Sequence, residues 1–511
     1  MEKLCNNLLK GNFNFPDDVE VPKYPANLPE RVIQFGEGNF LRAFVDWMIH
    51  QMNKKGLFNG RVVLVQPIPE GFTEKINEQD GLYTVILRGL RNGKPTEEKE
   101  IISSVSRAIN PYKDWDEFMK CAEDPQIEFV ISNTTEAGIA YDKEDRLDMK
   151  PPRSFPGKLT AYLYHRFRHF NGDPERGMVI MPCELIDRNG DNLKRIVLQL
   201  ADDWGLPEEF KEWVKEHNIF LNTLVDRVVT GYPKDEIEAI EEKLGYEDQL
   251  LDTGELFHLW VIEGPKELSE RLPFTKAGLN VIWTDDMTPY RTRKVRILNG
   301  AHTSSVPAAF LYGLETVGEM MDHEVMGEYV RSIIYDEIIP SIDLDRDMLV
   351  EFADAVIERF KNPFIKHYLI SILLNSTSKF KARVLPSIKE YYDKYGKLPE
   401  KLTFSMAALI SVYKDGKVEG SAMRAYREKG EFIMKDDLPV LEFYQNVWKA
   451  FDGSRNSALQ VARDVLGNTA LWDEDLNVIP GLAEKVGQYL YDIATCGIKD
   501  VVDRLVKGEG R

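Results

Sequence analysis

The sequence predicts an α/β domain with a β-hairpin insertion, followed by a mainly α-helical domain. Three observations lead to this prediction. Short apolar runs alternate with amphipathic stretches in the first half, an Asn-Gly pair lies between two strand-like runs, and helical periodicity dominates after about residue 285. The chain of 511 residues also exceeds the ~250–300 residues at which one core stops growing. We therefore expect two domains, residues 1–284 and 285–511.

Four runs in the first half are predicted to be buried parallel strands, because they are short, apolar and rich in β-branched residues. They are residues 31–35, 61–66, 127–132 and 177–182. Helical patterns lie between them, as at residues 40–53 and 111–122. Strand, helix and strand at this spacing are typical of a parallel sheet with helices on both faces.

An insertion interrupts this pattern. Residues 82–88 and 99–105 flank Asn92-Gly93, which is a strong hairpin signal. Strand-like runs at 257–262 and 279–284 close the first half. The stretches predicted to be helical after that point are 291–314, 323–339, 347–360, 364–374, 385–395, 404–414, 439–451 and 482–497. Strand-like alternation is almost absent there, so the second domain is predicted to be mainly α-helical.

The composition limits the possible classes of function. The net charge is −19 and the basic residues form no patch, so we expect neither nucleic-acid nor membrane partners. The four cysteines are widely separated, and no His lies at zinc-site spacing from them, so neither a disulfide framework nor a metal site is expected. Without a signal-peptide pattern or a ~20-residue apolar run, the protein is expected in the cytoplasm. We expect a monomer or a small homo-oligomer.

The first predicted strand runs directly into Gly36-Glu37-Gly38, at the start of a helical pattern. This placement permits a tight turn and lets a pyrophosphate approach backbone N–H groups, as in a Rossmann-like dinucleotide-binding domain. Leu41 stands where a third glycine is usual, and we expect Arg42 to reach the phosphates directly. An ordinary turn is the alternative. The residues expected to bind the cofactor here are Ile33, Gln34, Phe35, Gly36, Glu37, Gly38, Asn39, Phe40, Leu41 and Arg42.

The ends of two other strands are expected to contact the cofactor. Gln66 ends the second strand, where a ribose-binding acid is usual. No basic residue follows to hold a 2′-phosphate, which favours NAD over NADP, and Glu70 is a displaced substitute for the acid. The third strand ends in Asn133, Thr134, Thr135 and Glu136, which are expected near the nicotinamide and its ribose. A polar loop with no ligand is the alternative for any one of them.

Lys294, Asn299 and His302 are predicted to share one face of a helix, since His302 lies ~80° and Asn299 ~140° around the axis from Lys294. An alcohol that becomes a ketone needs a base for its proton and donors for the developing alkoxide. Lys, Asn and His supply both without a metal. Lys294 and His302 are ~12 Å apart along a regular helix, so the substrate lies across the face or the helix is irregular. The alternative is a surface lysine beside a buried amide–imidazole pair.

Together, Gly36-x-Gly38-x-Phe40-x-Arg42-Ala43 and Lys294-x4-Asn299-x2-His302 resemble the mannitol dehydrogenase family of polyol-specific long-chain dehydrogenases. The resemblance spans nearly the whole chain and implies an NAD-dependent oxidoreductase. It implies that Lys294 is the general acid/base, that Asn299 and His302 hold the reacting oxygen, and that Asn222 and Asp226 lie near the substrate or nicotinamide. Further matching stretches are 135–138, 182–184, 222–227 and 378–379. Leu185 stands where polyol-acting members have Asn.

Within the family, the sequence is most similar to members that interconvert a keto-hexuronate and an aldonate. A substrate carboxylate is best bound by a cationic side chain, and the sequence contains several candidates for this role. They are Lys379, Arg383 and His367, with Arg227, Arg293 and Arg359 as further possibilities. The alternatives are a reductase of an epimeric keto-hexuronate, a mannitol-type dehydrogenase, and a nucleotide-binding regulator with a decayed site.

Overall fold

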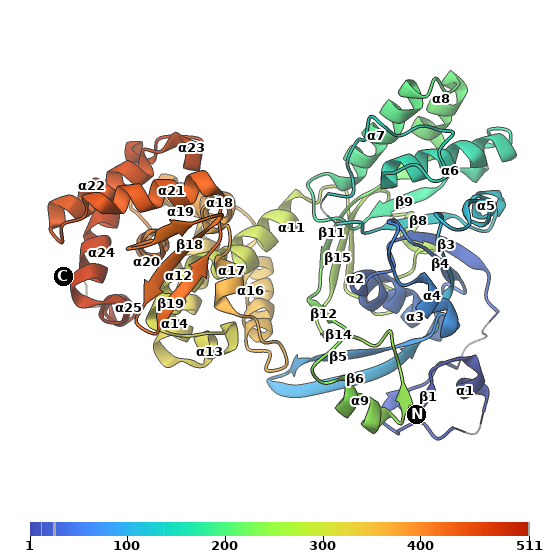
Figure 1. Ribbon diagram of the computed structural model, residues 1–511, viewed down its shortest axis with the longest axis horizontal. Helices are drawn as coiled ribbons and strands as arrows, with labels where there is room; N and C mark the ends of the chain where they lie inside the picture. The colour runs from blue at the N-terminus through green and yellow to red at the C-terminus, as the bar shows by residue number, and fades with distance from the viewer. Residues whose placement is uncertain (12, 24–26, 136, 509–511) are drawn as a thin grey trace. The chain divides into compact units, whose positions relative to one another are not determined.

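A computed structural model describes residues 1–11, 13–23, 27–135 and 137–508 (Figure 1). The chain divides into two compact units, one made of residues 1–89 and 95–287, the other of residues 90–94 and 288–511. None of the helices in the described ranges is long and apolar enough to cross a membrane.

The first unit is built on a six-stranded, fully parallel sheet in the order β10-β9-β8-β3-β4-β7. Its strands are β3 (Glu30–Phe35), β4 (Arg61–Val65), β7 (Val105–Ile109), β8 (Phe129–Ser132), β9 (Val179–Pro182) and β10 (Ile219–Phe220). The four predicted strands are confirmed as β3, β4, β8 and β9. The strands of this sheet therefore all run parallel, as the alternation of strands and helices predicts. The glycine turn follows its central strand β3.

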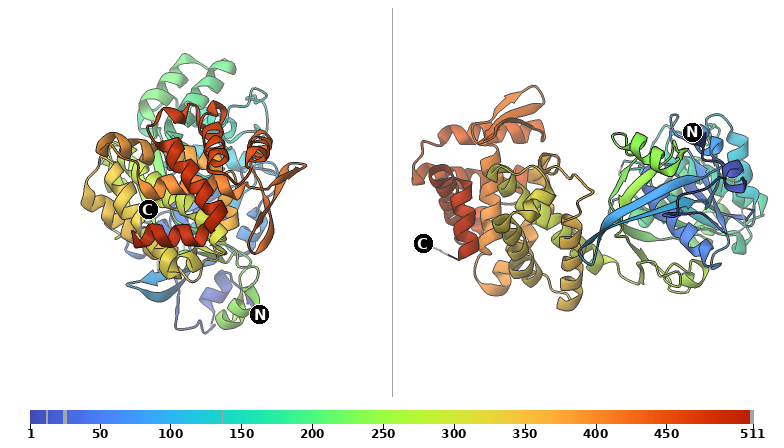
Figure 2. Two further views of the ribbon diagram at one scale, coloured as in Figure 1. Left: turned by 90° about the vertical axis from the view of Figure 1, so that its left-hand side faces the viewer. Right: turned by 90° about the horizontal axis from the view of Figure 1, so that it is seen from below.

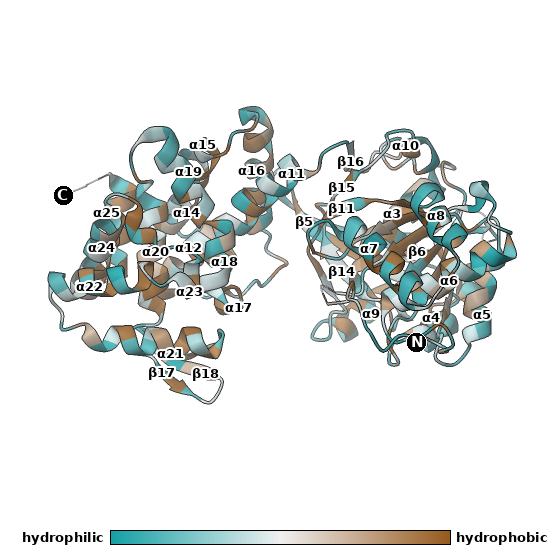
Figure 3. Ribbon diagram, turned by 90° about the horizontal axis from the view of Figure 1, so that it is seen from above, coloured by the Kyte–Doolittle hydropathy of each residue, from teal (hydrophilic) through white to brown (hydrophobic). Residues whose placement is uncertain are grey.

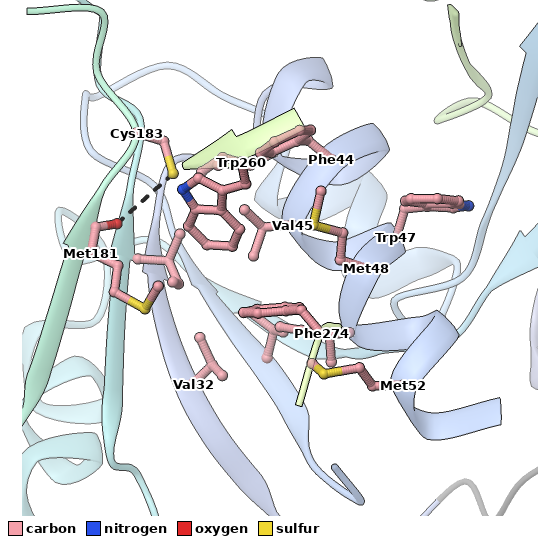
Figure 4. Close-up of a cluster of buried hydrophobic side chains, with 14 of the residues drawn as sticks. Val32, Phe44, Val45, Trp47, Met48, Met52, Met181, Cys183, Trp260 and Phe274 are labelled. Carbon is pink, nitrogen blue, oxygen red and sulfur yellow. Dashed lines mark hydrogen bonds between the residues drawn. The ribbon is translucent and has the colours of Figure 1, made fainter. Parts of the chain in front are cut away.

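The pleat of the sheet divides its side chains between two cores. Val32 packs with Phe44, Met48 and Met52 on the face covered by α3 (Trp47–Lys54), and Figure 4 shows this cluster with Trp260 and Phe274. Its neighbour Ile33 points to the opposite face, since successive strand residues alternate. That second core is formed with α5 (Trp115–Lys120), α6 (Phe155–His169), α7 (Asn189–Asp203) and α8 (Glu208–His217).

The predicted hairpin is confirmed as β5 (Tyr83–Arg91) and β6 (Lys94–Ile102), the long pair visible in Figure 2. Asn92 and Gly93 both have positive φ, 54° and 73°, which a two-residue hairpin turn of this kind requires. The hairpin belongs to a five-stranded sheet in the order β12-β14-β5-β6-β2. The other members are β12 (Val229–Gly231), β14 (Asp252–Glu255) and β2 (Val19–Glu20).

The last two strand-like runs of the first half are β15 (Leu259–Glu263) and β16 (Val281–Thr284). They form a separate three-stranded sheet with β11 (Asn222–Asp226), in the order β11-β15-β16. A small pairing of β1 (Glu2–Lys3) with β13 (Tyr246–Glu247) completes the first unit's sheets. Its remaining helices are α1 (Asn6–Lys10), α2 (Asn39–Leu41), α4 (Thr73–Glu78), α9 (Ile237–Leu244) and α10 (Leu268–Arg271).

The second unit is mainly α-helical, which confirms the predicted class. Its first helices are α11 (Thr288–Arg293), α12 (Gly300–Tyr312), α13 (Val317–Asp322), α14 (Glu324–Ser332), α15 (Ile339–Ser341), α16 (Arg346–Phe360), α17 (Leu369–Leu373), α18 (Ser376–Arg383) and α19 (Leu385–Tyr395). The later ones are α20 (Glu400–Val412), α21 (Leu438–Val447), α22 (Arg455–Leu466), α23 (Thr469–Trp472), α24 (Leu482–Cys496) and α25 (Ile498–Lys507). Helix α20 is buried along nearly its whole length, whereas outer helices such as α22 and α24 show both brown and teal faces (Figure 3).

One part of the second half differs from its prediction. An antiparallel sheet of β17 (Lys417–Glu419), β18 (Ala422–Arg427) and β19 (Gly430–Met434) lies between helices that the periodicity predicts. Its alternation is short, and the buried Met423, Ala425 and Met434 stand next to charged residues such as Arg424 and Lys435. The helix predicted over 364–374 is also shorter, since only α17 forms there.

Candidate active site

The two glycines of the turn after β3 have different environments. Gly36 has φ of +118°, and a Cβ on it would lie 2.8 Å from the Asn133 carbonyl oxygen. Only glycine therefore fits there. Gly38 has an ordinary φ of −70° and precedes α2, and a Cβ on it would meet no other described residue within 4 Å beyond its chain neighbours. Open space beside a backbone at a helix start is what a pyrophosphate group needs.

The end of β8 is held in place by Glu184, which follows β9. The Glu184 carboxylate accepts hydrogen bonds from the Thr134 backbone N–H and hydroxyl at 3.0 and 2.9 Å, and from the Ser132 hydroxyl at 3.0 Å. Burial raises the pKa of Glu184. Thr135 has φ of +72°, which is rare for a β-branched residue and typical of strained functional turns. Glu136 lies outside the described residues.

Arg42 is turned into the protein. Its side chain is 2% exposed and lies 3.6 Å from the buried Asp252 carboxylate. The guanidinium also donates to the carbonyls of Glu37 and Leu250 and to the Asn39 side chain. The prediction that Arg42 reaches the phosphates is therefore wrong, because all of its nitrogens have partners beneath the turn.

Other residues predicted to bind the cofactor also support the turn from below. The side chains of Ile33, Phe35 and Leu41 are buried in the two cores, so they offer a ligand no contact. Gln34 is fully buried and donates to the Gly36 carbonyl and the Asp46 carboxylate. Burial raises the pKa of Asp46 to about 7.

Near the mouth of the turn, Glu37 is 6% exposed, and burial raises the pKa of its carboxyl. Its carboxylate accepts a hydrogen bond from the Phe72 N–H at 3.3 Å. Asn39 and Phe40 are half-buried, and the Phe40 ring stacks on Phe44 at 5.0 Å.

Gln66 has a structural role in place of the predicted ribose contact. It is 2% exposed. Its amide donates to the Ile68 and Pro69 carbonyls and accepts from the Thr73 hydroxyl. Gln66 thus folds the loop after β4 back towards Glu37. The same loop exposes two apolar side chains that no sequence motif marks, Ile68 at 57% and Phe72 at 42% exposure.

In the second unit, Lys294–Asn299 forms a π-helical segment between α11 and α12. Its backbone follows the i→i+5 pattern, so Lys294 and Asn299, five residues apart, lie on the same side of the helix. In a regular helix they would be ~140° apart around the axis. The helix is thus irregular at Lys294, one of the two possibilities that the 12 Å estimate left open. Insertions of this kind are frequent at functional sites.

His302 follows on α12 with its ring enclosed. It stacks on Phe360 with ring centroids 4.0 Å apart and meets the edge of His367 at 5.2 Å. Burial, with the charges of His367, Arg359 and Arg383, holds the pKa of His302 well below its usual value. Its Nε2 is buried and has no hydrogen-bond partner among the described residues. His302 is therefore a neutral ring with one nitrogen available for a ligand.

Helix α18 brings two cations to this place. Lys379 and Arg383 are one turn apart, so they share a face of the helix. Glycine at position 300 permits the approach, because a Cβ there would lie 3.0 Å from the Arg383 carbonyl oxygen. Burial and the charge of Arg383 lower the pKa of Lys379, and burial and the charge of Lys379 lower that of His367. The structure thus gathers Lys379, Arg383 and His367 around His302.

Three residues of the first unit that were predicted near the substrate are buried. Asn222 is 4% exposed. Its side chain donates to Glu263 and accepts from the Asp191 N–H, so both ends of its amide have partners within the protein, and its contact with substrate stays a prediction. Asp226 is 5% exposed at the end of β11. Arg227 is also buried. It donates to three backbone carbonyls and lies over the Trp47 ring at 4.2 Å, so it does not serve as the carboxylate partner.

No group of three or more His, Cys, Asp or Glu residues in the described ranges is arranged to hold a metal ion. The four cysteines are free thiols. Leu185, next to Glu184, is 58% exposed, so this position presents an apolar side chain to solvent.

Two family models match the chain in succession. The mannitol dehydrogenase Rossmann domain matches residues 30–276, and the mannitol dehydrogenase C-terminal domain matches residues 286–494. Together they cover most of both units.

Curated relatives match over nearly their whole length. The altronate oxidoreductase of Bacillus subtilis is 47% identical over 93% of this chain and 95% of its own. That of Pectobacterium atrosepticum is 48% identical over 93% and 96%. Among solved structures, Pseudomonas fluorescens mannitol 2-dehydrogenase with NAD and D-mannitol has a TM-score of 0.71 at 21% identity, over 99% of this chain and 100% of that one. A D-sorbitol dehydrogenase has a TM-score of 0.78 at 20% identity, over 98% and 100%. These two structures share the fold.

Proposed function

The chain belongs to the mannitol dehydrogenase family, and from this premise we propose that it is an NAD-dependent tagaturonate reductase that interconverts D-tagaturonate and D-altronate. Residues 1–284 bind the dinucleotide in this proposal, and residues 285–511 bind the sugar acid. The observation that carries the chemistry is the π-helical segment that places Lys294 and Asn299 on one side of a helix, next to the neutral His302. The relatives' name, altronate oxidoreductase, supports the choice of substrate.

Each residue of the triplet has one task in the reduction. A bound nicotinamide supplies the hydride, which adds to the ketone carbon. Asn299 donates a hydrogen bond to the carbonyl oxygen through its amide, and His302 does so through Nε2–H, so both stabilise the alkoxide as it forms. Lys294 gives this oxygen a proton and is reloaded from solvent. Ketone, hydride and proton give the alcohol, and the oxidation of altronate is the reverse.

The dinucleotide is placed along the carboxyl edge of the parallel sheet in this proposal. The open space beside Gly38 takes the pyrophosphate, and the loop after β4 takes the adenosine, with Ile68 and Phe72 as apolar surfaces for the adenine. Residues 66–70 contain no Arg or Lys, which supports NAD over NADP because a 2′-phosphate asks for a cation. The free thiols of all four cysteines support a reducing compartment such as the cytoplasm.

Lys294→Ala tests the chemistry. We expect kcat for D-tagaturonate with NADH to fall by about 10²–10⁴-fold, the contribution of a positioned acid/base, while NADH binding measured by fluorescence is unchanged. Lys381→Ala is the matched control, because Lys381 is another lysine of the same unit, and it is paired with Asp473 at 2.8 Å. Near wild-type turnover by Lys294→Ala would exclude Lys294 as the acid/base. D-Fructuronate and D-mannitol, assayed in parallel with NAD(H) and NADP(H), separate the activities of other family members.

A further inference from the structure

Arg383 differs from the other cations near the site. Its side chain is half-buried, and burial lowers the pKa of its guanidinium. Within the described part of the chain, however, this guanidinium has no hydrogen bond or ion pair. A partly buried charge without a counter-charge is costly, so it indicates a place where an anion is expected to bind.

The neighbouring cations are already engaged. Arg296 is 5% exposed and forms a two-pronged ion pair with Glu390, at 3.0 and 2.8 Å. Lys379 donates to the Ile372 carbonyl at 3.0 Å. Arg293 and Arg359 both have partners in the chain. Among the described residues of this cluster, Arg383 is thus a cation whose donors are unused.

The backbone of Arg383 lies against the start of α12. Its carbonyl oxygen lies 3.0 Å from the position that a Cβ on Gly300 would occupy, and Gly300 lies between Asn299 and His302 in the chain. The last residue of α18 is therefore packed against the start of α12, beside the groups expected to hold the reacting oxygen. A planar guanidinium on this residue has the fork geometry that matches a carboxylate.

We propose that Arg383 binds the carboxylate of the substrate, and that it is the residue that makes the site select a sugar acid over a neutral sugar. This inference rests on the proposed function. In a keto-hexuronate the carboxylate and the ketone are at opposite ends of a short hydroxylated chain. One molecule then spans from Asn299 and His302, at its ketone, to Arg383, at its carboxylate. Lys379 adds positive potential on the same helix face.

The test compares D-tagaturonate with D-tagatose, which has CH2OH where the acid has its carboxylate. We expect Arg383→Ala to lower kcat/KM for D-tagaturonate by about 10- to 150-fold, the range for losing a hydrogen bond to a charged group. The loss is expected in KM, with kcat and the kcat/KM for D-tagatose within about threefold of wild type. Arg383→Lys should recover part of the loss. Lys381→Gln removes a cation of the same helix that is paired with Asp473. This control should leave kcat/KM unchanged for both sugars.

The possible outcomes are distinct. Equal loss on both sugars, an equal effect of Lys381→Gln, or unchanged KM for D-tagaturonate would each overturn the role of Arg383. A thermal unfolding midpoint within about 2 °C of wild type identifies a folded variant. If Arg383→Ala is unstable, the same comparison of the two sugars is made with Arg383→Lys. If wild-type protein reduces D-fructuronate but not D-tagaturonate, the proposed function fails alone, and the same variants are compared on D-fructuronate and D-fructose. If wild type prefers neutral sugars, both proposals fail.

Discussion

Replacing Arg42 by Met tests whether this side chain supports the glycine turn from inside the protein or contacts the cofactor. Met has a similar length and no charge. The change leaves Asp252 buried without its cation, and removes the hydrogen bonds to Glu37, Leu250 and Asn39. Breaking a buried pair by removing one partner costs about 3–5 kcal/mol. At roughly 2–4 °C per kcal/mol for a large domain, the first unit is expected to unfold about 6–20 °C lower.

The loss is expected to depend on pH. Burial raises the pKa of Asp252 to about 7, while the charge of Arg42 lowers it. In the unfolded chain Asp ionises near pH ~4, so stability falls as the pH rises from ~4 to the folded pKa. Without Arg42 the folded pKa is higher, and the fall continues beyond pH 7. The difference between wild type and Arg42→Met should therefore be larger at pH 8 than at pH 6.

Calorimetry at both pH values, with NADH titration by fluorescence, measures this prediction. Arg188→Met is the control, because Arg188 forms shorter ion pairs, 2.7 and 2.8 Å, but is 49% exposed. Exposed pairs contribute about 0–1 kcal/mol. Adding Asp252→Asn to Arg42→Met should recover part of the stability. An unchanged unfolding temperature with weaker, salt-dependent NADH binding would refute the reasoning, since that is the behaviour of a phosphate contact.

Three further variants probe the carboxyl edge of the sheet. Gly38→Ala should leave the unfolding temperature within about 2 °C and raise the Kd for NADH at least about tenfold, because its Cβ enters space left open for the ligand; unchanged Kd would place the pyrophosphate elsewhere. Gly36→Ala should instead destabilise by about 1–3 kcal/mol, since it forces a positive φ on alanine against the Asn133 carbonyl, and equal stability of the two variants would contradict this. Glu184→Ala should lower stability by about 2–3 kcal/mol and weaken NADH binding, because the half-buried Thr134 N–H loses its acceptor; retained stability in a denaturant melt would show that Ser132 and Thr134 do not depend on this carboxylate.

Local signals were sufficient for much of the fold. The runs that became β3, β4, β8 and β9 are apolar on both sides, as a strand covered on both faces must be. Asn92-Gly93 marks its hairpin because few other residue pairs accept two positive φ values. In the second half, α19 was predicted from its helical period at residues 385–395, and the length of a regular helix left an irregular helix near Lys294 as one of two possibilities.

The errors concern contacts between distant parts of the chain. Arg42 has the position of a phosphate ligand in the sequence, but its partners Leu250 and Asp252 lie just before and at the start of β14, more than 200 residues later. Gln66 likewise stands at a ribose position, yet its amide is used by the loop that follows. The sheet of β17–β19 was missed because each strand is short and charged. Neither period nor spacing reports which polar groups find partners when the chain folds.

The measurement that tests the central claim most directly is the rate of NADH oxidation by wild-type protein with D-tagaturonate, against D-fructuronate, D-tagatose and D-fructose, and with NADPH in place of NADH. The geometry around Lys294, Asn299 and His302, with the guanidinium of Arg383 beside them, predicts the highest kcat/KM for D-tagaturonate with NADH, and at least about tenfold less for D-tagatose. Equal or faster turnover of the neutral sugars, or no hydride transfer to any keto-hexuronate, would contradict it.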